Sequence, residues 1–130
     1  MNTVNTMSKP IFKYDEPGDT MYVSFASGET GIGIELNEQI LLRINETKRR
    51  AIGLTLFDYS VLARRTEIGF RSLPLNGLEG LPTEMRELVL KILLSAPVKD
   101  VLSLSAYTPS TAETIPITSL QNSVLERKAA

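Results

Sequence analysis

The chain has 130 residues, of which 22% are charged and 42% hydrophobic, and its formal net charge is -1. These values are typical of one globular domain, and the near-neutral charge gives no indication of binding to nucleic acid or to an anionic membrane. The chain contains no histidine, cysteine or tryptophan. This composition excludes disulfides, thiol chemistry and histidine-based catalysis, so we expect a protein that is not an enzyme and holds no cofactor, although Ser-Lys or carboxylate-only catalysis stays formally open.

The first eight residues are polar, and we expect residues 1–8 to be disordered and residues 9–130 to form a single α+β domain. Residues 1–8 also lack the basic and apolar pattern of a signal peptide, and no apolar run reaches the length of a membrane span. We therefore expect a cytoplasmic protein.

Two stretches rich in β-branched and aromatic residues, Ile11–Tyr14 and Thr20–Ala26, flank the sequence Asp15-Glu16-Pro17-Gly18-Asp19. Proline and glycine supply the backbone angles of a turn, so the pattern predicts a β-hairpin.

Pairing Tyr14 with Thr20 places Phe12 opposite Tyr22 and gathers three aromatic residues on one face, with four apolar residues on the other: Ile11, Met21, Val23 and Phe25. The aromatic face Phe12, Tyr14 and Tyr22 is then either a partner surface or a second small core under the helices.

The hairpin sequence, Tyr-Asp-x-x-x-Asp-x-x-Tyr-Val-x-Phe over residues 14–25, resembles the opening of a bacterial family of short proteins known as a domain of unknown function. Gly53–Ser60 is similar to the family's later motif, but Thr55 stands where the family has Glu and Tyr59 where it has Ala. The resemblance covers residues 11–62. It implies a hairpin followed by further strands and a loose association with toxin–antitoxin pairs, and it implies no catalytic residue.

Three further stretches alternate between apolar and other residues and predict strands: Ile32–Leu36, Ile40–Ile44 and Ile52–Leu56. A three-residue turn at 37–39 keeps one face aliphatic by pairing Ile34 with Leu42, and a turn at 47–49 places Ile44 opposite Ile52. The five strands are expected to form an antiparallel β-meander with one strongly apolar face.

The apolar face requires a cover, which the second half of the chain is expected to supply. Asp58 or Ser60 can cap a short helix, and the stripe within Met85–Leu94 predicts a longer helix that ends before Pro97. A sixth strand follows at Val101–Tyr107. Two shorter elements complete the α+β prediction, an edge segment at Ile115–Ile117, because proline suits an edge, and a last short helix at Leu120–Arg127.

Three carboxylates, Asp15, Glu16 and Asp19, share the hairpin turn and are weak candidates for a divalent-metal site. The competing interpretation is a solvated turn whose Asp side chains bond the backbone, which we favour because calcium needs six to eight oxygens. The basic residues at 48–50 and 64–65 suggest either a basic patch for phosphate or an acidic partner, or a charged turn and a polar helix face.

We expect a non-catalytic protein-interaction or regulatory module, which is antitoxin-like if the resemblance extends to function. The broad apolar stripe of the Met85–Leu94 helix, with Leu90 and Leu94 at its margin, predicts a homodimer through this helix or through a sheet edge, together with a possible protein partner. A monomer is expected instead if the segment after Pro97 folds back and covers the helix completely. The alternative is a small-molecule or divalent-metal binding protein at the Asp15–Asp19 hairpin.

Overall fold

The computed structural model describes residues 9–121. The disorder expected for residues 1–8 and the part of the last helix beyond residue 121 therefore lie outside the described residues. Leu120, where that helix was expected to begin, instead ends a strand, so the prediction of its start is wrong.

The first half of the chain forms the predicted five-stranded antiparallel sheet, and the α+β class is confirmed. Its order is β1-β2-β5-β4-β3, so β5 joins the β1–β2 hairpin to the β3–β4 hairpin. The strands are β1 Ile11–Asp15, β2 Thr20–Ser24, β3 Ile32–Glu35, β4 Ile40–Asn45 and β5 Arg50–Phe57.

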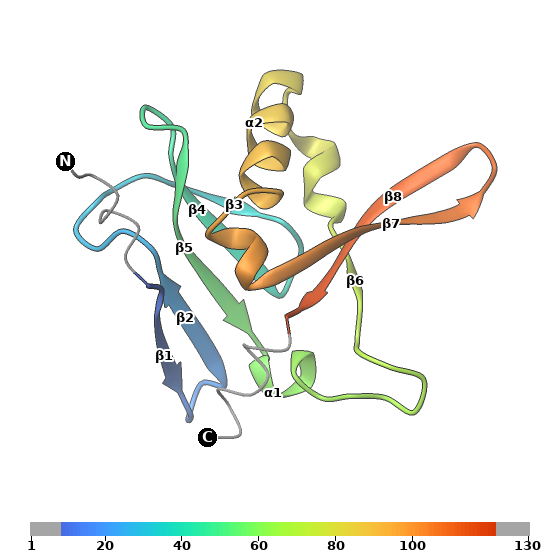
Figure 1. Cartoon of the computed structure of the whole chain (residues 1–130), viewed down its shortest axis with the longest axis horizontal. Helices are drawn as coiled ribbons and strands as arrows, with labels where there is room; N and C mark the ends of the chain where they lie inside the picture. The colour runs from blue at the N-terminus through green and yellow to red at the C-terminus, as the bar shows by residue number, and fades with distance from the viewer. Residues whose placement is uncertain (1–8, 122–130) are drawn as a thin grey trace.

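The second half covers the apolar face of this sheet and adds a smaller sheet of order β6-β8-β7 (Figure 1). Helix α2 carries four buried apolar residues that join the core of the sheet: Leu88, Val89, Ile92 and Leu93. The elements are α1 Tyr59–Leu62, β6 Leu73–Pro74, η2 Asn76–Gly80, α2 Thr83–Leu93, η3 Val98–Asp100, β7 Leu102–Ser110 and β8 Glu113–Leu120. No helix in the described part of the chain is long and apolar enough to cross a membrane.

The β1–β2 hairpin forms with a register that differs by one residue from the predicted one. Tyr14 pairs with Met21 and Phe12 with Val23, so the turn holds four residues. A shift of one residue moves side chains to the opposite face. Phe12 and Tyr14 therefore pack against the core, whereas Tyr22 points to the outer face, and the predicted aromatic cluster of these three residues is wrong. Ile11, which was expected on the apolar face, is exposed.

The β3–β4 hairpin has the predicted register, with Ile34 opposite Leu42 and a three-residue turn. In this turn the side-chain oxygen of Asn37 accepts hydrogen bonds from the backbone N–H groups of Gln39 and Ile40, at 2.8 and 2.9 Å. The β4–β5 pair has a register shift between Arg43 and Ile44, so Ile44 lies opposite Ala51 rather than Ile52.

The prediction for the last strand is wrong in its position. The Ile115–Ile117 segment belongs to β8, which is the central strand of the smaller sheet and not an edge. Proline is tolerated because the Pro116 carbonyl accepts a hydrogen bond from the backbone N–H of Leu75, at 2.9 Å, and this contact needs no donor from Pro116.

Leu54 lies at the centre of the core with 2% of its surface exposed. We expect Leu54→Asp to unfold the protein, because an unpaired buried carboxylate costs several kcal/mol against a total stability of about 5–15 kcal/mol. The neighbouring change Thr55→Asp, on the outer face, is the control and is expected to cost at most about 1 kcal/mol. Circular dichroism melting measures both, and equal melting temperatures would contradict the assignment of faces.

Candidate functional site

The turn between β1 and β2 is fixed to the start of α1, just after β5, by the carboxylate of Asp19. Its Oδ1 accepts hydrogen bonds from the Tyr14 hydroxyl at 2.7 Å and from the Ser60 backbone N–H at 2.9 Å. Its Oδ2 accepts a hydrogen bond from the Ser60 hydroxyl at 2.7 Å. We call Tyr14, Asp19, Tyr59 and Ser60 the Asp19 network.

Asp19 also replaces the predicted cap of α1. Asp58, at the N-cap position, has φ of 54° and makes no capping hydrogen bond with its side chain. Asp19 instead accepts the Ser60 N–H with its carboxylate and the Tyr59 N–H with its backbone carbonyl, at 2.9 Å each. These contacts satisfy two of the N–H groups that a helix start leaves without an intrahelical partner.

Two tyrosines pack within the Asp19 network, with the ring centroids of Tyr14 and Tyr59 5.6 Å apart. The hydrogen bond to Asp19, and then burial, raise the pKa of Tyr14 to about 12, because the carboxylate favours the protonated hydroxyl. Burial raises the pKa of Tyr59, which has no exposed surface.

The predicted metal candidates Asp15 and Asp19 therefore sit in different surroundings. Both carboxylate oxygens of Asp19 already accept hydrogen bonds from the protein, while Asp15 lies at the end of β1. Within residues 9–121, no group of three or more Asp or Glu side chains is placed to hold a metal ion.

The predicted interaction residues are divided between the core and the surface. Phe12, Tyr14 and Leu90 are partly buried against the core. Tyr22 is 46% exposed on the outer sheet face, and Leu94 is 61% exposed at the end of α2. The structure therefore does not bring these five residues together into one surface.

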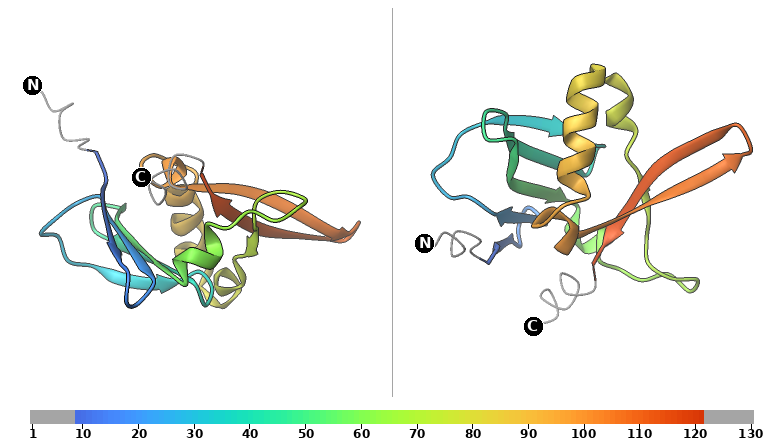
Figure 2. Two further views of the ribbon diagram at one scale, coloured as in Figure 1. Left: turned by 90° about the horizontal axis from the view of Figure 1, so that it is seen from below. Right: turned by 45° about the horizontal axis from the view of Figure 1, so that its top comes forward.

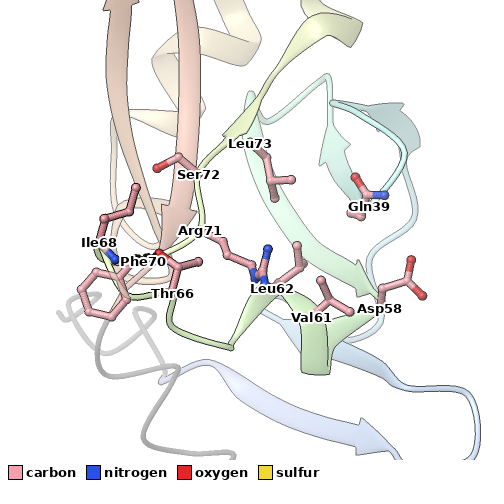
Figure 3. A pocket seen from close by; sticks show the side chains of 10 residues that line it. All are labelled: Gln39, Asp58, Val61, Leu62, Thr66, Ile68, Phe70, Arg71, Ser72 and Leu73. Carbon is pink, nitrogen blue, oxygen red and sulfur yellow. Dashed lines mark hydrogen bonds between the residues drawn. The ribbon is translucent and has the colours of Figure 1, made fainter.

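A pocket of about 400 Å³ lies between α1 and the segment that leads to β6 (Figure 3). We call it the α1 pocket. Its lining combines apolar and polar side chains, namely Gln39, Asp58, Val61, Leu62, Thr66, Ile68, Phe70, Arg71, Ser72 and Leu73.

At the rim of the α1 pocket, a tight turn displays Ile68 with 98% of its surface exposed. Thr66 fixes this turn, because its backbone N–H and its hydroxyl both donate to the Gly69 carbonyl at 2.7 Å. Gly69 has φ of 133°, which suits a residue without a side chain. Phe70 follows, half exposed, with the Arg65 guanidinium carbon 4.4 Å from its ring centroid. The turn thus exposes the apolar side chain of Ile68 to solvent, on a backbone that the Thr66–Gly69 hydrogen bonds fix.

Arg71 supplies the cationic group of the pocket. Figure 3 shows its side chain reaching from the segment toward α1, beside Leu62. Its Nε is buried and donates no hydrogen bond within the described residues. A buried donor of this kind favours a ligand or partner that brings a carboxylate or carbonyl oxygen.

The α1 pocket was missed by the sequence analysis because residues 63–72 show neither helical nor strand periodicity. One signal was available in the sequence. Two large apolar residues, Ile68 and Phe70, flank a glycine and lie between Arg65 and Arg71, a pattern that favours an exposed apolar turn.

The basic residues at the β4–β5 turn do not join those after α1, because the two groups flank opposite ends of β5. Arg50 and Lys48 form ion pairs with Glu29. The hydrogen bond from Arg50, followed by that from Asn45, lowers the pKa of Glu29. Of the two interpretations of the basic residues, a charged turn therefore describes Lys48 and Arg50 better than a phosphate patch does.

No protein-family model, curated protein or solved structure matches this chain. The resemblance of residues 11–62 to a bacterial family of unknown function therefore stays a prediction.

We expect Asp19→Asn to lower the free energy of unfolding by about 1.5–3 kcal/mol, because hydrogen bonds to a charged group contribute on this scale. Asparagine tolerates the left-handed backbone of this position, where φ is 50°, so the change reports on the carboxylate. Urea denaturation measures the loss. The control is Glu16→Gln, which removes the same charge from an exposed position of the turn; an equal effect of both variants would contradict the role of Asp19.

Titration of Tyr14 gives an independent test of the same contact. We expect the difference in tyrosinate absorbance between wild type and Tyr14→Phe to have its midpoint near pH 12. Because the folded pKa lies above the ordinary value of 10.0, this contribution to stability is complete below pH 10 and is lost as the pH rises toward 12. In Asp19→Asn the midpoint should move down, and an unchanged midpoint would show that Asp19 does not cause the shift.

Proposed function

We propose that the chain is a non-catalytic, cytoplasmic protein-interaction or regulatory module of the antitoxin-like kind, and that the rim of the α1 pocket is its main partner surface. The observation that carries the proposal is Ile68, a large apolar side chain almost fully exposed on an ordered turn. Exposed apolar groups that cluster mark interaction sites more often than scattered ones do. Here Phe70, which is partly exposed, lies beside Ile68, and Val61, also partly exposed, lines the opposite side of the pocket on α1 (Figure 3).

The chemistry of the α1 pocket defines the partner further. Ile68 and Phe70 favour an apolar side chain, and the buried Nε of Arg71 favours an oxygen acceptor next to it. A protein surface that presents a large apolar residue beside a carboxylate or a main-chain carbonyl satisfies both requirements. The absence of histidine and cysteine from the chain supports binding rather than catalysis.

We do not propose the alternative, a divalent-metal or small-molecule site at the Asp15–Asp19 hairpin. The carboxylate of Asp19 accepts three hydrogen bonds from Tyr14 and Ser60, and metal coordination would have to displace them. The expected homodimer remains part of the proposal.

Ile68→Asp tests the partner surface. Affinity capture from the source cells, followed by mass spectrometry, should find at least one protein that wild type retains more than about tenfold better than the variant, since loss of a central apolar contact costs about 2 kcal/mol or more. Thr111→Asp, which places the same charge on another exposed turn, is the control and should retain that protein. Identical captured sets for wild type and Ile68→Asp would show that the α1 pocket is not the partner surface.

A further inference from the structure

The β7–β8 hairpin projects away from the body of the protein as an arm (Figures 1 and 2). At its base, Leu102, Thr118 and Leu120 are buried. From Ser105 to Thr114, through the distal part of both strands and the turn, every residue is exposed. The arm therefore has a distal part whose side chains are covered by nothing in the described structure.

A hairpin of two strands is only marginally stable in water unless a third strand or a packed layer supports it. Strand β6 supplies a third strand over a short stretch, where Leu73 pairs with Thr118 and Pro74 with Ile117, and the following Leu75 N–H donates to the Pro116 carbonyl. Beyond Pro116, toward the tip, β7 and β8 are paired with each other alone among the residues that the structure describes. An additional strand along the arm would supply the missing support.

The outer edge of β7 lacks the features that usually protect an edge strand. Such edges commonly carry charged residues, prolines or bulges. The segment Leu102–Tyr107 has none of these features, and the register shift and Pro109 come only after Tyr107. Glu113 is the one charged residue between Leu102 and Leu120. The edge is thus open to pairing over six residues, a length of about 20 Å.

The hydrogen bonds of the smaller sheet show which groups of β7 face outward. The Pro116 carbonyl is directed toward β6, because it accepts a hydrogen bond from Leu75 N–H at 2.9 Å. Pro116 lies opposite Ala106. Two directly opposite residues of an antiparallel ladder either exchange backbone hydrogen bonds or both point their N–H and C=O groups away from each other. Pro116 and Ala106 form a pair of the second kind. The N–H and C=O of Ala106, and by alternation those of Leu104, therefore point away from β8 to the outer edge.

We propose that β7 pairs antiparallel with β7 of a second copy, so that the two three-stranded sheets join across a two-fold axis. Antiparallel pairing about such an axis places two identical segments opposite each other. Because the β7 segment is uncharged, this arrangement brings no like charges together. The outward groups of Leu104 and Ala106 both fit such pairing, and we place the axis at or next to Ala106 because Ala106 is exposed whereas Leu104 is partly buried. Each arm then gains the third strand that it lacks.

The α2 stripe is a less suitable surface for a second copy. Leu88, Val89, Ile92 and Leu93 are already buried against the sheet of their own chain, and Leu90 is partly buried. Leu94 alone remains largely exposed, at the end of the helix. The proposal thus deepens the proposed function by naming one partner, a second copy, and one surface, the β7 edge.

The test uses opposite charges at Ala106 in the full-length chain. Ala106 is exposed, and its side chain is small, so Ala106→Lys and Ala106→Glu are each expected to fold like wild type. In a dimer paired through β7, each variant brings two like charges together near the axis and should weaken self-association at least about tenfold. An equimolar mixture of the two variants brings opposite charges together and should restore the dimer.

Light scattering over a range of concentrations measures the mass, which is 14.4 kDa for the monomer and twice that for the dimer. A monomeric wild type would overturn the proposal, as would a dimer that both single variants leave unchanged. Loss of the dimer in both variants without recovery in the mixture would also overturn pairing at Ala106. Ile68→Asp separates this proposal from the partner surface at the α1 pocket, because that variant should keep the β7-paired dimer while losing the captured protein.

Discussion

The carboxylate of Asp19 is the constraint on which the first half of the structure depends. Asp19 is the last residue of the β1–β2 turn, and its carboxylate accepts hydrogen bonds from both Tyr14 of β1 and Ser60 of α1. Strand β2 pairs with β5, so the start of β2 lies next to the end of β5, where α1 begins. The hairpin turn and the segment that follows β5 therefore meet in one hydrogen-bonded network, which gives Tyr14, Asp19 and Ser60 a structural role.

The hairpin register could not be predicted from the local sequence. Alternation within residues 11–25 fits either register, and the two registers differ in whether Asp15 belongs to the turn or to β1. In the structure Asp15 pairs with Thr20, and Asp19 ends the turn, with a left-handed backbone and hydrogen bonds to Ser60, 41 residues away. The resulting four-residue turn places Phe12 and Tyr14 on the core face. Between β3 and β4, the register follows from whether the turn has an odd or even number of residues, and the predicted pairing of Ile34 with Leu42 is confirmed.

The second half was less predictable because its structure depends on partners distant in sequence. The helix was predicted from the stripe of Leu88, Val89 and Ile92, which period 3.6 alone reveals. The proline at position 116 led to the prediction of an edge strand. A central position is acceptable because the neighbouring segment after β6 donates the Leu75 N–H to the Pro116 carbonyl and needs no N–H from Pro116. The α1 pocket depends on an irregular segment, for which no periodic pattern exists. Sequence reasoning therefore located the scaffold and missed the displayed surfaces.

The division between scaffold and displayed surface follows the chain itself. Residues 11–62 place most of their aliphatic side chains in the core, with Leu42, Leu54 and Leu56 almost without exposed surface. Two features that present uncharged or apolar groups to solvent, the Ile68 turn and the β7 arm, lie after residue 62, whereas the first half exposes single residues such as Ile11 and Tyr22. If the α1 pocket and the β7 edge bind partners as proposed, residues after residue 62 select those partners while the first half builds the sheet. Proteins that share the hairpin and differ after residue 62 should then share this fold core and differ in these two surfaces.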